Sequence, residues 1–400
     1  MKRREFLTKA GAGAALGAMA APAIAQSAPT VKWRLQTSWP KSLDTTHGGV
    51  EAMAKRILAM TDGKFEIQVL TAGAIVPGNQ VFDAVQNGNM EATHTLSTFF
   101  IGKNPAFTFD SGLPFGLNSR QQQAWINWGG GLELLREVYK PYGVLNFPCG
   151  NTGVQMGGWY RKEIKSVADL KGLKMRIGGI GGSILAKLGV TPQQLPPGDI
   201  YPALEKGTID AAEFIGPHDD EKLGLNKVAK FYYYPGWWEG SAQNTMFVNQ
   251  KAWDALPKAY QEVLECAAHE QDTVMTANYD QKNPIALKKL VGSGTLLRSF
   301  PKPVMDACYK ASQEVLDELA GKHADFKKIY DQWSKFRDDQ NVWFRVAEYT
   351  LDRYRYEVSA AKCRGRSAVA RQHRRAAYGD ARRWVSRRIE WKSTASPVKA

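Results

Sequence analysis

The stretch over residues 171–213 most constrains the fold, because strand-like and helix-like segments alternate in it around a run of glycines. Leu173 to Ile177 alternates apolar and polar residues, as a half-buried strand does, and carries Arg176 near its end. The glycines follow at once, and we expect Ser183 to cap a short helix over Ile184 to Leu188. A guanidinium, open backbone and a helix N-terminus at one strand end would hold a small anion, a carboxylate in particular.

Two other interpretations of this stretch stay open from the residues alone. The first is a surface arginine followed by a flexible glycine loop. The second is a dinucleotide-binding turn, which fits poorly because the run lacks a G-x-G-x-x-G pattern. The acid about twenty residues on, Asp199, also follows Pro196-Pro197 instead of closing a strand.

The first hundred residues show the same alternation. Strand patterns cover residues 31–38, 65–70 and 90–96, and helical patterns cover residues 46–60 and 77–85. Such alternation predicts an α/β fold with mostly parallel sheets and right-handed crossovers.

A faint internal repeat indicates two lobes. Residues 84–92 and 203–211 both resemble a helix end, a glycine C-cap and a buried strand. Chance could produce so short a match; the alternative is two similarly built lobes, the second beginning near Asn151, with a cleft at the strand ends. Residues 244–249 are predicted as a strand that returns to the first lobe, and together with residues 148–155 they would form a hinge.

The C-terminal part is helical and then changes character. Helical patterns follow Trp253 and cover 305–319, and residues 326–358 form a long amphipathic stretch rich in aromatics. That stretch packs either on its own lobes or on a second copy of the chain. Residues 359–400 are Arg-rich and weakly periodic, which indicates a disordered or artefactual tail; a nucleic-acid-binding tail is the rival interpretation.

The net charge of +14 is unevenly distributed. From Lys362 onward twelve lysines and arginines face two acids, which accounts for +10. Residues 1–25 add +3, so the body of the chain is nearly neutral. Composition therefore gives no reason to expect that the folded body binds nucleic acid.

The four cysteines, Cys149, Cys266, Cys308 and Cys363, show no C-x-x-C spacing. This disfavours zinc and thioredoxin-like chemistry. A disulfide could form in an oxidising compartment, but no pair is selected by the sequence.

The N-terminus predicts export. Arg3-Arg4 begins a twin-arginine pattern, and Ala23-Ile24-Ala25 is an A-x-A-type cleavage site after a weakly apolar run. Residues 1–25 are therefore predicted as a twin-arginine signal peptide that directs the chain to a bacterial periplasm; the alternative is a disordered basic leader. No later stretch approaches 18 consecutive apolar residues.

Four collinear segments carry a family resemblance. They are NTGVQMGGWYRKEI (151–164), KGLKMRIGGIGG (171–182), GDIYPALEKGTIDAAEFIGPHDDEKLG (198–224) and YYYPGWWEG (232–240). From about Val31 to Val358 the chain resembles the DctP family, the solute-binding subunits of tripartite ATP-independent periplasmic (TRAP) transporters. It is most similar to the branch that binds 2-oxo acids such as pyruvate.

The resemblance implies a two-lobe periplasmic binding protein fold with a hinge and long C-terminal helices. The expected division assigns 26–152 plus about 243–281 to lobe 1, 153–242 plus about 282–325 to lobe 2, and 326–358 to a long C-terminal helix.

The resemblance also implies a site. The carboxylate-binding arginine of the family falls on Arg176, where the residues alone already indicated an anion site. A bridging metal ion, sodium more than calcium, would be held by Gln155, Glu213, the Phe214 carbonyl and Glu239. A hard cation with oxygen ligands suits this set, although ligand types alone do not separate sodium from calcium.

Three further residues complete the expected site. Trp237 and Phe115 would be apolar walls, and Asn151 would either donate to the ligand carboxylate or only shape the turn after Gly150. The chain departs from close relatives at Phe214, where Trp is usual, and at His218, where Tyr is common. A smaller wall at 214 could admit a larger ligand side chain.

The expected function is delivery of a small monocarboxylate to a TRAP membrane permease, with no organic cofactor, no nucleic-acid partner and a homodimer through residues 326–358 as an open alternative. Lactate or another hydroxy acid bound with calcium is the alternative ligand. An exported enzyme is disfavoured, because G-x-S-x-G and H-E-x-x-H are absent and the six histidines show no catalytic spacing.

Overall fold

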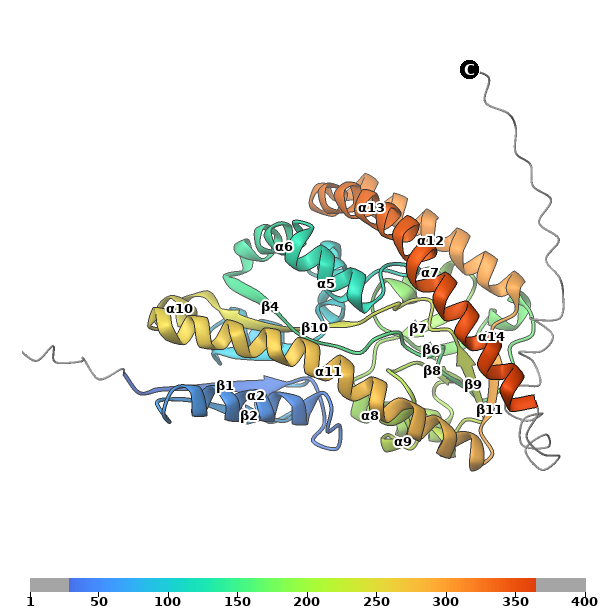
Figure 1. The fold of residues 1–400 in the computed structure, drawn as a ribbon, viewed down its shortest axis with the longest axis horizontal. Helices are drawn as coiled ribbons and strands as arrows, with labels where there is room; N and C mark the ends of the chain where they lie inside the picture. The colour runs from blue at the N-terminus through green and yellow to red at the C-terminus, as the bar shows by residue number, and fades with distance from the viewer. Residues whose placement is uncertain (1–28, 365–400) are drawn as a thin grey trace, which may run out of the picture.

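The computed structural model describes residues 29–364 and contains two β-sheets covered by helices (Figure 1). The five-stranded sheet, at the left of Figure 1, defines lobe 1, and the six-stranded sheet, at the right, defines lobe 2. The predicted α/β class and two-lobe organisation are confirmed. The signal peptide expected at 1–25 and the chain beyond residue 364 lie outside the described residues.

Lobe 1 is built on a sheet of order β2-β1-β3-β10-β4. Its strands are β1 (Val31–Thr37), β2 (Phe65–Leu70), β3 (Ala92–Thr95), β4 (Val144–Asn151) and β10 (Gln243–Asn249). The first three run parallel, and β10 runs antiparallel to both β3 and β4, which confirms the predicted returning strand. The helices of this lobe are α2 (His47–Met60), α3 (Val81–Gln86), α4 (Thr108–Ser111), α5 (Ser119–Trp128), α6 (Gly131–Tyr139) and α10 (Gln250–Asp254).

Lobe 2 has the sheet order β11-β9-β5-β8-β6-β7. Its strands are β5 (Trp159–Tyr160), β6 (Lys174–Arg176), β7 (Thr191–Gln193), β8 (Ala211–Ala212), β9 (Phe231–Tyr234) and β11 (Leu296–Ser299). Its helices are α7 (Gly179–Lys187), α8 (Pro197–Lys206), α9 (Pro217–Lys222) and α12 (Lys302–Lys322). The β6, β7 and β8 strands are parallel, so their carboxyl ends meet at one edge.

The repeat seen in the sequence has a counterpart in each lobe. Gly88 follows α3 with φ +73°, and Gly207 follows α8 with φ +72°. A left-handed glycine ends each helix, and β3 or β8 follows. The two lobes therefore share this local unit.

The chain crosses between the lobes after β4, after β9 and along α11 (Lys258–Gly292). This helix, one continuous element despite Pro284, packs against β4 and α2 of lobe 1 and against α9 of lobe 2 (Figure 1). Its buried Asp272 accepts hydrogen bonds from the Gly150 amide (3.0 Å) and the Gln243 side chain (2.5 Å). Both connecting strands are thus tied to α11 at the predicted hinge, although the sequence did not indicate one helix of this length.

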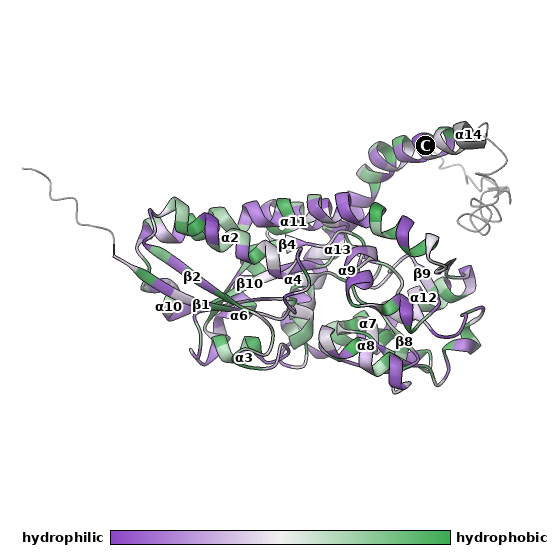
Figure 2. Cartoon of the chain, turned by 90° about the horizontal axis from the view of Figure 1, so that it is seen from below, coloured by the Kyte–Doolittle hydropathy of each residue, from purple (hydrophilic) through white to green (hydrophobic). Residues whose placement is uncertain are grey.

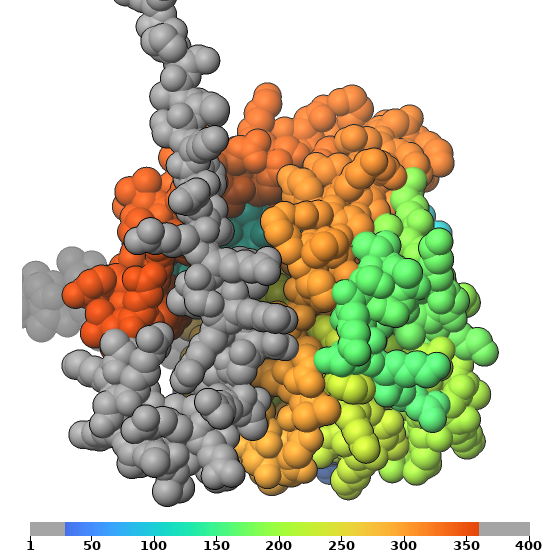
Figure 3. All heavy atoms as spheres, turned by 90° about the vertical axis from the view of Figure 1, so that its right-hand side faces the viewer, coloured from blue at the N-terminus to red at the C-terminus, as the bar shows by residue number. Residues whose placement is uncertain are grey.

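The C-terminal helices are α13 (Ala324–Phe344) and α14 (Thr350–Arg364), joined by a π-helical turn, η7 (Arg345–Tyr349). In α13 the buried Phe326 and Trp333 pack on Phe109 of lobe 1. Beyond it the chain leaves the body: Figure 2 shows α14 standing away from both lobes, and in Figure 3 its red atoms lie at the left edge of the face shown. Within residues 29–364 no helix combines the length and apolar character that crossing a bilayer requires.

Two sequence expectations were wrong in their boundaries. The helix expected over 184–188 with Ser183 as its cap begins at Gly179, because the glycines allow close packing: a Cβ at Gly181 would lie 3.1 Å from Trp238. The tail expected from residue 359 is helical through Arg364, because the change of composition after Val358 does not remove helix-forming residues.

Candidate functional site

The site begins where two neighbouring parallel strands end. Arg176 is the last residue of β6, its register partner Ala212 closes β8, and Glu213 follows at once. Because the carboxyl ends of parallel strands lie at one edge, the two side chains meet there. Arg176 Nη1 donates to the Glu213 carbonyl oxygen (2.7 Å) and forms an ion pair with the Glu213 carboxylate. Both residues are buried, which excludes the surface-arginine interpretation.

Further contacts fix the pair. Arg176 Nε donates to the Leu195 carbonyl oxygen (3.2 Å), and the Gly178 amide donates to Glu213 Oε1 (3.3 Å). The Phe214 ring centroid lies 5.7 Å from the guanidinium carbon, within cation–π range. Burial raises the pKa of Glu213, while the Arg176 charge and the Gly178 amide act in the opposite direction. The Leu195 carbonyl and the Gly178 amide are site contacts that the sequence did not reveal.

Glu239 adds a second carboxyl to the same electrostatic environment. Burial, together with repulsion from Glu213, raises the pKa of Glu239 to about 8, and Arg176 opposes the rise. The Glu239 carbonyl accepts a hydrogen bond from the Gln155 amide (3.2 Å), so the loops after β4 and β9 are joined here. One guanidinium therefore faces two carboxyl groups, and a bound cation would favour the ionised form of Glu239.

Gln155 supports a cation at this place. Its side chain is buried, and its Oε1 atom has no hydrogen-bond partner among the described residues. A buried amide oxygen without a donor is costly unless something else satisfies it. One amide oxygen, two carboxylates and the backbone carbonyl of Phe214 are the oxygen ligands that sodium and calcium accept, so the residues present fit such an ion.

The expected aromatic walls form one stack. The Phe115 and Trp237 rings lie 5.1 Å apart and nearly parallel, and the Phe115 amide donates to the Trp237 carbonyl (2.7 Å). Tyr309 of α12 packs edge-on against Phe115. It is the neighbouring residue, Trp238, that lies beside the α7 glycines next to Arg176. The role of Phe115 and Trp237 as ligand walls thus stays a prediction.

Asn151 lies at the crossing between the lobes. Its Nδ2 donates to Gln243 Oε1 (3.0 Å), and its Oδ1 accepts from the Gly153 amide (2.9 Å). These contacts agree with the turn-shaping alternative for this fully buried residue.

The lobes contact each other near Arg176. A small cavity between them has a volume of about 10 Å³, roughly the space of one water molecule. Lobe 1 lines it with Ser38, Gly78, Asn79 and Phe99, and lobe 2 with Gln194, Leu195, Pro196 and Pro197. Gln194 Nε2 donates to the Phe99 carbonyl across this gap (3.0 Å). Arg176, whose Nε donates to the Leu195 carbonyl, therefore lies next to this contact between the lobes.

The sequence matches a family model over residues 36–323, that of bacterial extracellular solute-binding protein, family 7. A monocarboxylate 2-oxoacid-binding periplasmic protein of Nostoc sp. is 49% identical over 360 residues, 88% of this chain and 99% of that protein.

Two solved TRAP solute-binding proteins share the fold. One from Bordetella bronchiseptica is 62% identical, with a TM-score of 0.83 over 84% of this chain and 99% of that chain; it is a dimer with copurified calcium and picolinate in one site and an apo second site. One from Pseudoalteromonas atlantica, with bound sodium and pyruvate, is 38% identical, with a TM-score of 0.78 over 80% and 98% of the two chains.

The fold and the site define a two-lobe binding protein that encloses a small ligand. The chain belongs to family 7 of the bacterial extracellular solute-binding proteins, the DctP family, whose members serve TRAP transporters in the periplasm. Its relatives among the proteins compared are solute-binding proteins, as the sequence predicted.

Proposed function

We propose that this chain binds a 2-oxo monocarboxylate such as pyruvate, together with a bridging cation, and delivers it to a TRAP membrane permease. The observation that carries the proposal is the buried Arg176 at the strand edge, beside Glu213 and next to the contact between the lobes. Arg176 would hold one edge of the ligand carboxylate by charge-assisted hydrogen bonds. The relatives from Nostoc and Pseudoalteromonas, which bind 2-oxoacids or pyruvate, support this class of ligand.

The charge of the site argues for the cation. Without a cation, burial keeps Glu239 protonated, so Arg176 balances only the Glu213 carboxylate, and a ligand carboxylate would then add an unbalanced negative charge. A cation held by Gln155, Glu213, Glu239 and the Phe214 carbonyl would supply the missing positive charge and polarise the 2-oxo oxygen. Relatives hold sodium or calcium, so both ions belong in the test.

Calorimetry on the mature chain tests this function. Pyruvate, 2-oxobutyrate, lactate and a polyol are titrated in sodium, in calcium and after chelation in a sodium-free buffer. We expect pyruvate to bind in the presence of a cation, to bind at least tenfold more weakly without one, and to be recovered unchanged. Preference for lactate would move the ligand class to hydroxy acids, and turnover of any acid would overturn the binding-protein assignment.

We also propose that the chain forms a homodimer through α14. Exposed apolar side chains continue along residues 342–356, which run from the end of α13 through η7 into α14. They are Val342, Trp343, Val346, Tyr349, Leu351, Tyr354 and Tyr356. Solvent-facing aromatics in such number indicate a covered surface, and the Bordetella relative is a dimer. Light scattering should give twice the chain mass, and Tyr354→Asp combined with Leu351→Asp should give a monomer.

Export by the twin-arginine route and the lobe boundaries at about 152, 242 and 281 are part of the same proposal. The pattern at Arg3-Arg4 supports the route. Replacing both arginines by lysine should keep the precursor in the cytoplasm, whereas export of that variant would favour another route.

A further inference from the structure

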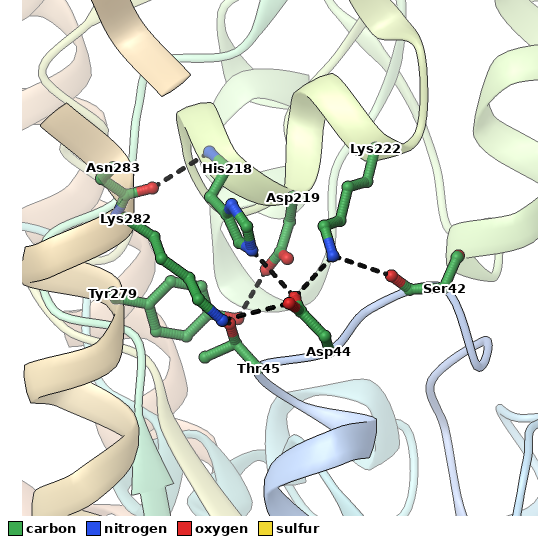
Figure 4. A network of polar contacts seen from close by, with 9 residues as sticks. All are labelled: Ser42, Asp44, Thr45, His218, Asp219, Lys222, Tyr279, Lys282 and Asn283. Atoms are coloured by element: carbon green, nitrogen blue, oxygen red, sulfur yellow. Dashed lines mark hydrogen bonds and ion pairs between the residues drawn. The ribbon is translucent and has the colours of Figure 1, made fainter. Parts of the chain in front are cut away.

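Asp44 lies between β1 and α2 of lobe 1 and faces α9 of lobe 2 (Figure 4). Its Oδ1 contacts His218 Nε2 (2.8 Å) and Lys222 Nζ (2.6 Å), both carried by α9. Its Oδ2 contacts Lys282 Nζ of α11 (3.1 Å). Lys222 Nζ also donates to the Ser42 carbonyl oxygen (3.3 Å). One lobe 1 carboxylate is thus contacted by a histidine and two lysines of α9 and α11.

The α9 helix that carries two of these side chains is anchored from its inner face. Asp219 accepts a hydrogen bond from the Tyr279 hydroxyl of α11 (2.5 Å). Asp220 accepts from Trp159 Nε1 (2.9 Å) and the Tyr232 hydroxyl (2.6 Å), which belong to the lobe 2 sheet. Both aspartates are fully buried. The α9 helix is therefore held by its inner face to α11 and to strands β5 and β9 of lobe 2.

The same helix is joined to the binding loop. Asp220 Oδ1 accepts from the Ile215 amide (3.3 Å), and only Ile215 and Gly216 separate α9 from Phe214. The loop that presents Glu213 and Phe214 thus ends in the element that contacts Asp44. The contact between Asp44 and α9 is therefore connected through Ile215 and Gly216 to the loop of Glu213 and Phe214.

The cluster is better explained by ion pairing than by a bound metal. Asp44, His218 and Asp219 each offer a ligand atom, and these atoms lie within 4.8 Å of one another. However, the ammonium groups of Lys222 and Lys282 already occupy the Asp44 oxygens, so an added cation would meet two positive charges. Burial opposes ionisation of Asp44, yet hydrogen bonds from Lys222, His218 and Lys282 lower its pKa overall. The carboxylate is charged and its counterions are supplied by the protein.

We propose that Asp44 is a positioning residue that latches lobe 1 to lobe 2 over the bound ligand and thereby sets the rate of ligand release. This inference rests on the proposed function, since it concerns release from that site. Asp44 is about half exposed and its three partners are less so, so each pair is individually weak and screened by salt. Because all three contacts share one carboxylate, removal of Asp44 should weaken the contact between the lobes more than removal of a single surface ion pair would.

The test is the release rate of pyruvate, measured by stopped-flow fluorescence after dilution. For Asp44→Asn we expect release to be about 5- to 30-fold faster at low salt, with a smaller ratio at 0.5 M salt. Glu163→Gln is the matched control, because its ion pair with Arg298 lies within lobe 2. We expect that variant to release pyruvate at the wild-type rate.

A double-mutant cycle separates the latch from a general loss of charge. If Asp44 acts through Lys222, then Lys222→Met should add less than its own effect when Asp44→Asn is already present. Release within twofold of the wild type at low salt for Asp44→Asn, or simple additivity of the two changes, would overturn the latch. Thermal melting of each variant shows whether it is folded.

A ligand-independent measurement keeps the two proposals apart. Small-angle X-ray scattering without ligand should give a larger radius of gyration for Asp44→Asn than for the wild type at low salt, and an equal one for Glu163→Gln. If the wild type fails to bind pyruvate, the proposed ligand is wrong while a larger radius still supports the latch. An unchanged radius in that case overturns the latch as well.

Discussion

Replacement of Arg176 by alanine is the strongest test of the site. The side chain donates to the Glu213 carbonyl and carboxylate and to the Leu195 carbonyl, and it is the cation expected to hold the ligand. Its removal would delete the two charge-assisted hydrogen bonds that we propose it makes to the ligand carboxylate. It also leaves Glu213 and Glu239 without their positive neighbour.

The magnitude follows from these contacts. Hydrogen bonds to charged groups are worth about 1.5–3 kcal/mol each, so two of them contribute roughly 3–6 kcal/mol. At about 1.4 kcal/mol per factor of ten, pyruvate affinity should fall roughly 10²- to 10⁴-fold. Arg176→Lys keeps the charge but loses the two-pronged geometry, and we expect it to lose about 10- to 100-fold.

The assay is calorimetric titration with pyruvate, supported by the ligand-induced rise in melting temperature. Arg298→Lys is the control, because Arg298 lies on β11 at the far edge of the same sheet and pairs with Glu163. It should bind as the wild type does. A Kd for Arg176→Ala within threefold of the wild type, in a protein that melts cooperatively, would refute the assignment of Arg176.

Three further perturbations probe the cation, the closure and the buried acids. Glu239→Gln should weaken pyruvate binding at least tenfold by calorimetry and reduce its dependence on sodium or calcium, because a charged oxygen ligand is lost; unchanged cation dependence would contradict the role. Gly179→Ala should weaken binding at least tenfold, since its Cβ would lie 2.0 Å from Thr98 Oγ1 across the gap. Gly172→Ala, equally strained at φ +73° but with open space, should bind normally. Burial raises the pKa of Asp220 to about 7, with hydrogen bonds from Tyr232 and Trp159 opposing the rise. Between about pH 4 and 7 the folded chain keeps a proton that the unfolded chain releases. Because of this group, the free energy of unfolding should fall by about 1.4 kcal/mol per pH unit as the pH rises through that range. Asp220→Asn should remove that slope in urea titrations, and equal slopes for both proteins would contradict it.

The sequence predicted the parts of the fold that local patterns determine. The strands β1, β2 and β10 lie where alternation placed them, and Arg176 ends β6 as expected, because a period of two and a following glycine run are local properties. The start of α7 was misplaced because its glycines depend on the packing of Trp238 and Pro192, which no window of the sequence contains.

The site was predictable only in part for the same reason. Glu213, Glu239 and Gln155 came from the family resemblance. Taken singly, Glu213 resembled an edge carboxylate and Gln155 an ordinary polar strand residue, while Glu239, next to Trp237-Trp238, was the most suggestive. The Leu195 carbonyl and the Asp44 contacts to α9 link residues 19 and 174 or more positions apart. Pairings at such separations are fixed by how the two sheets pack, which the pattern of apolar residues does not encode.

The charges of the site also explain why cation and acid should bind together. A cation alone would approach Arg176, and a carboxylate alone would approach the Glu213 carboxylate, so each binds against a like charge. Bound together, each cancels the repulsion that the other meets. By linkage the cation must then raise pyruvate affinity by the same factor as pyruvate raises cation affinity. The buried Arg176–Glu213 pair is the physical origin of this coupling, because it places one positive and one negative group beside both ligands.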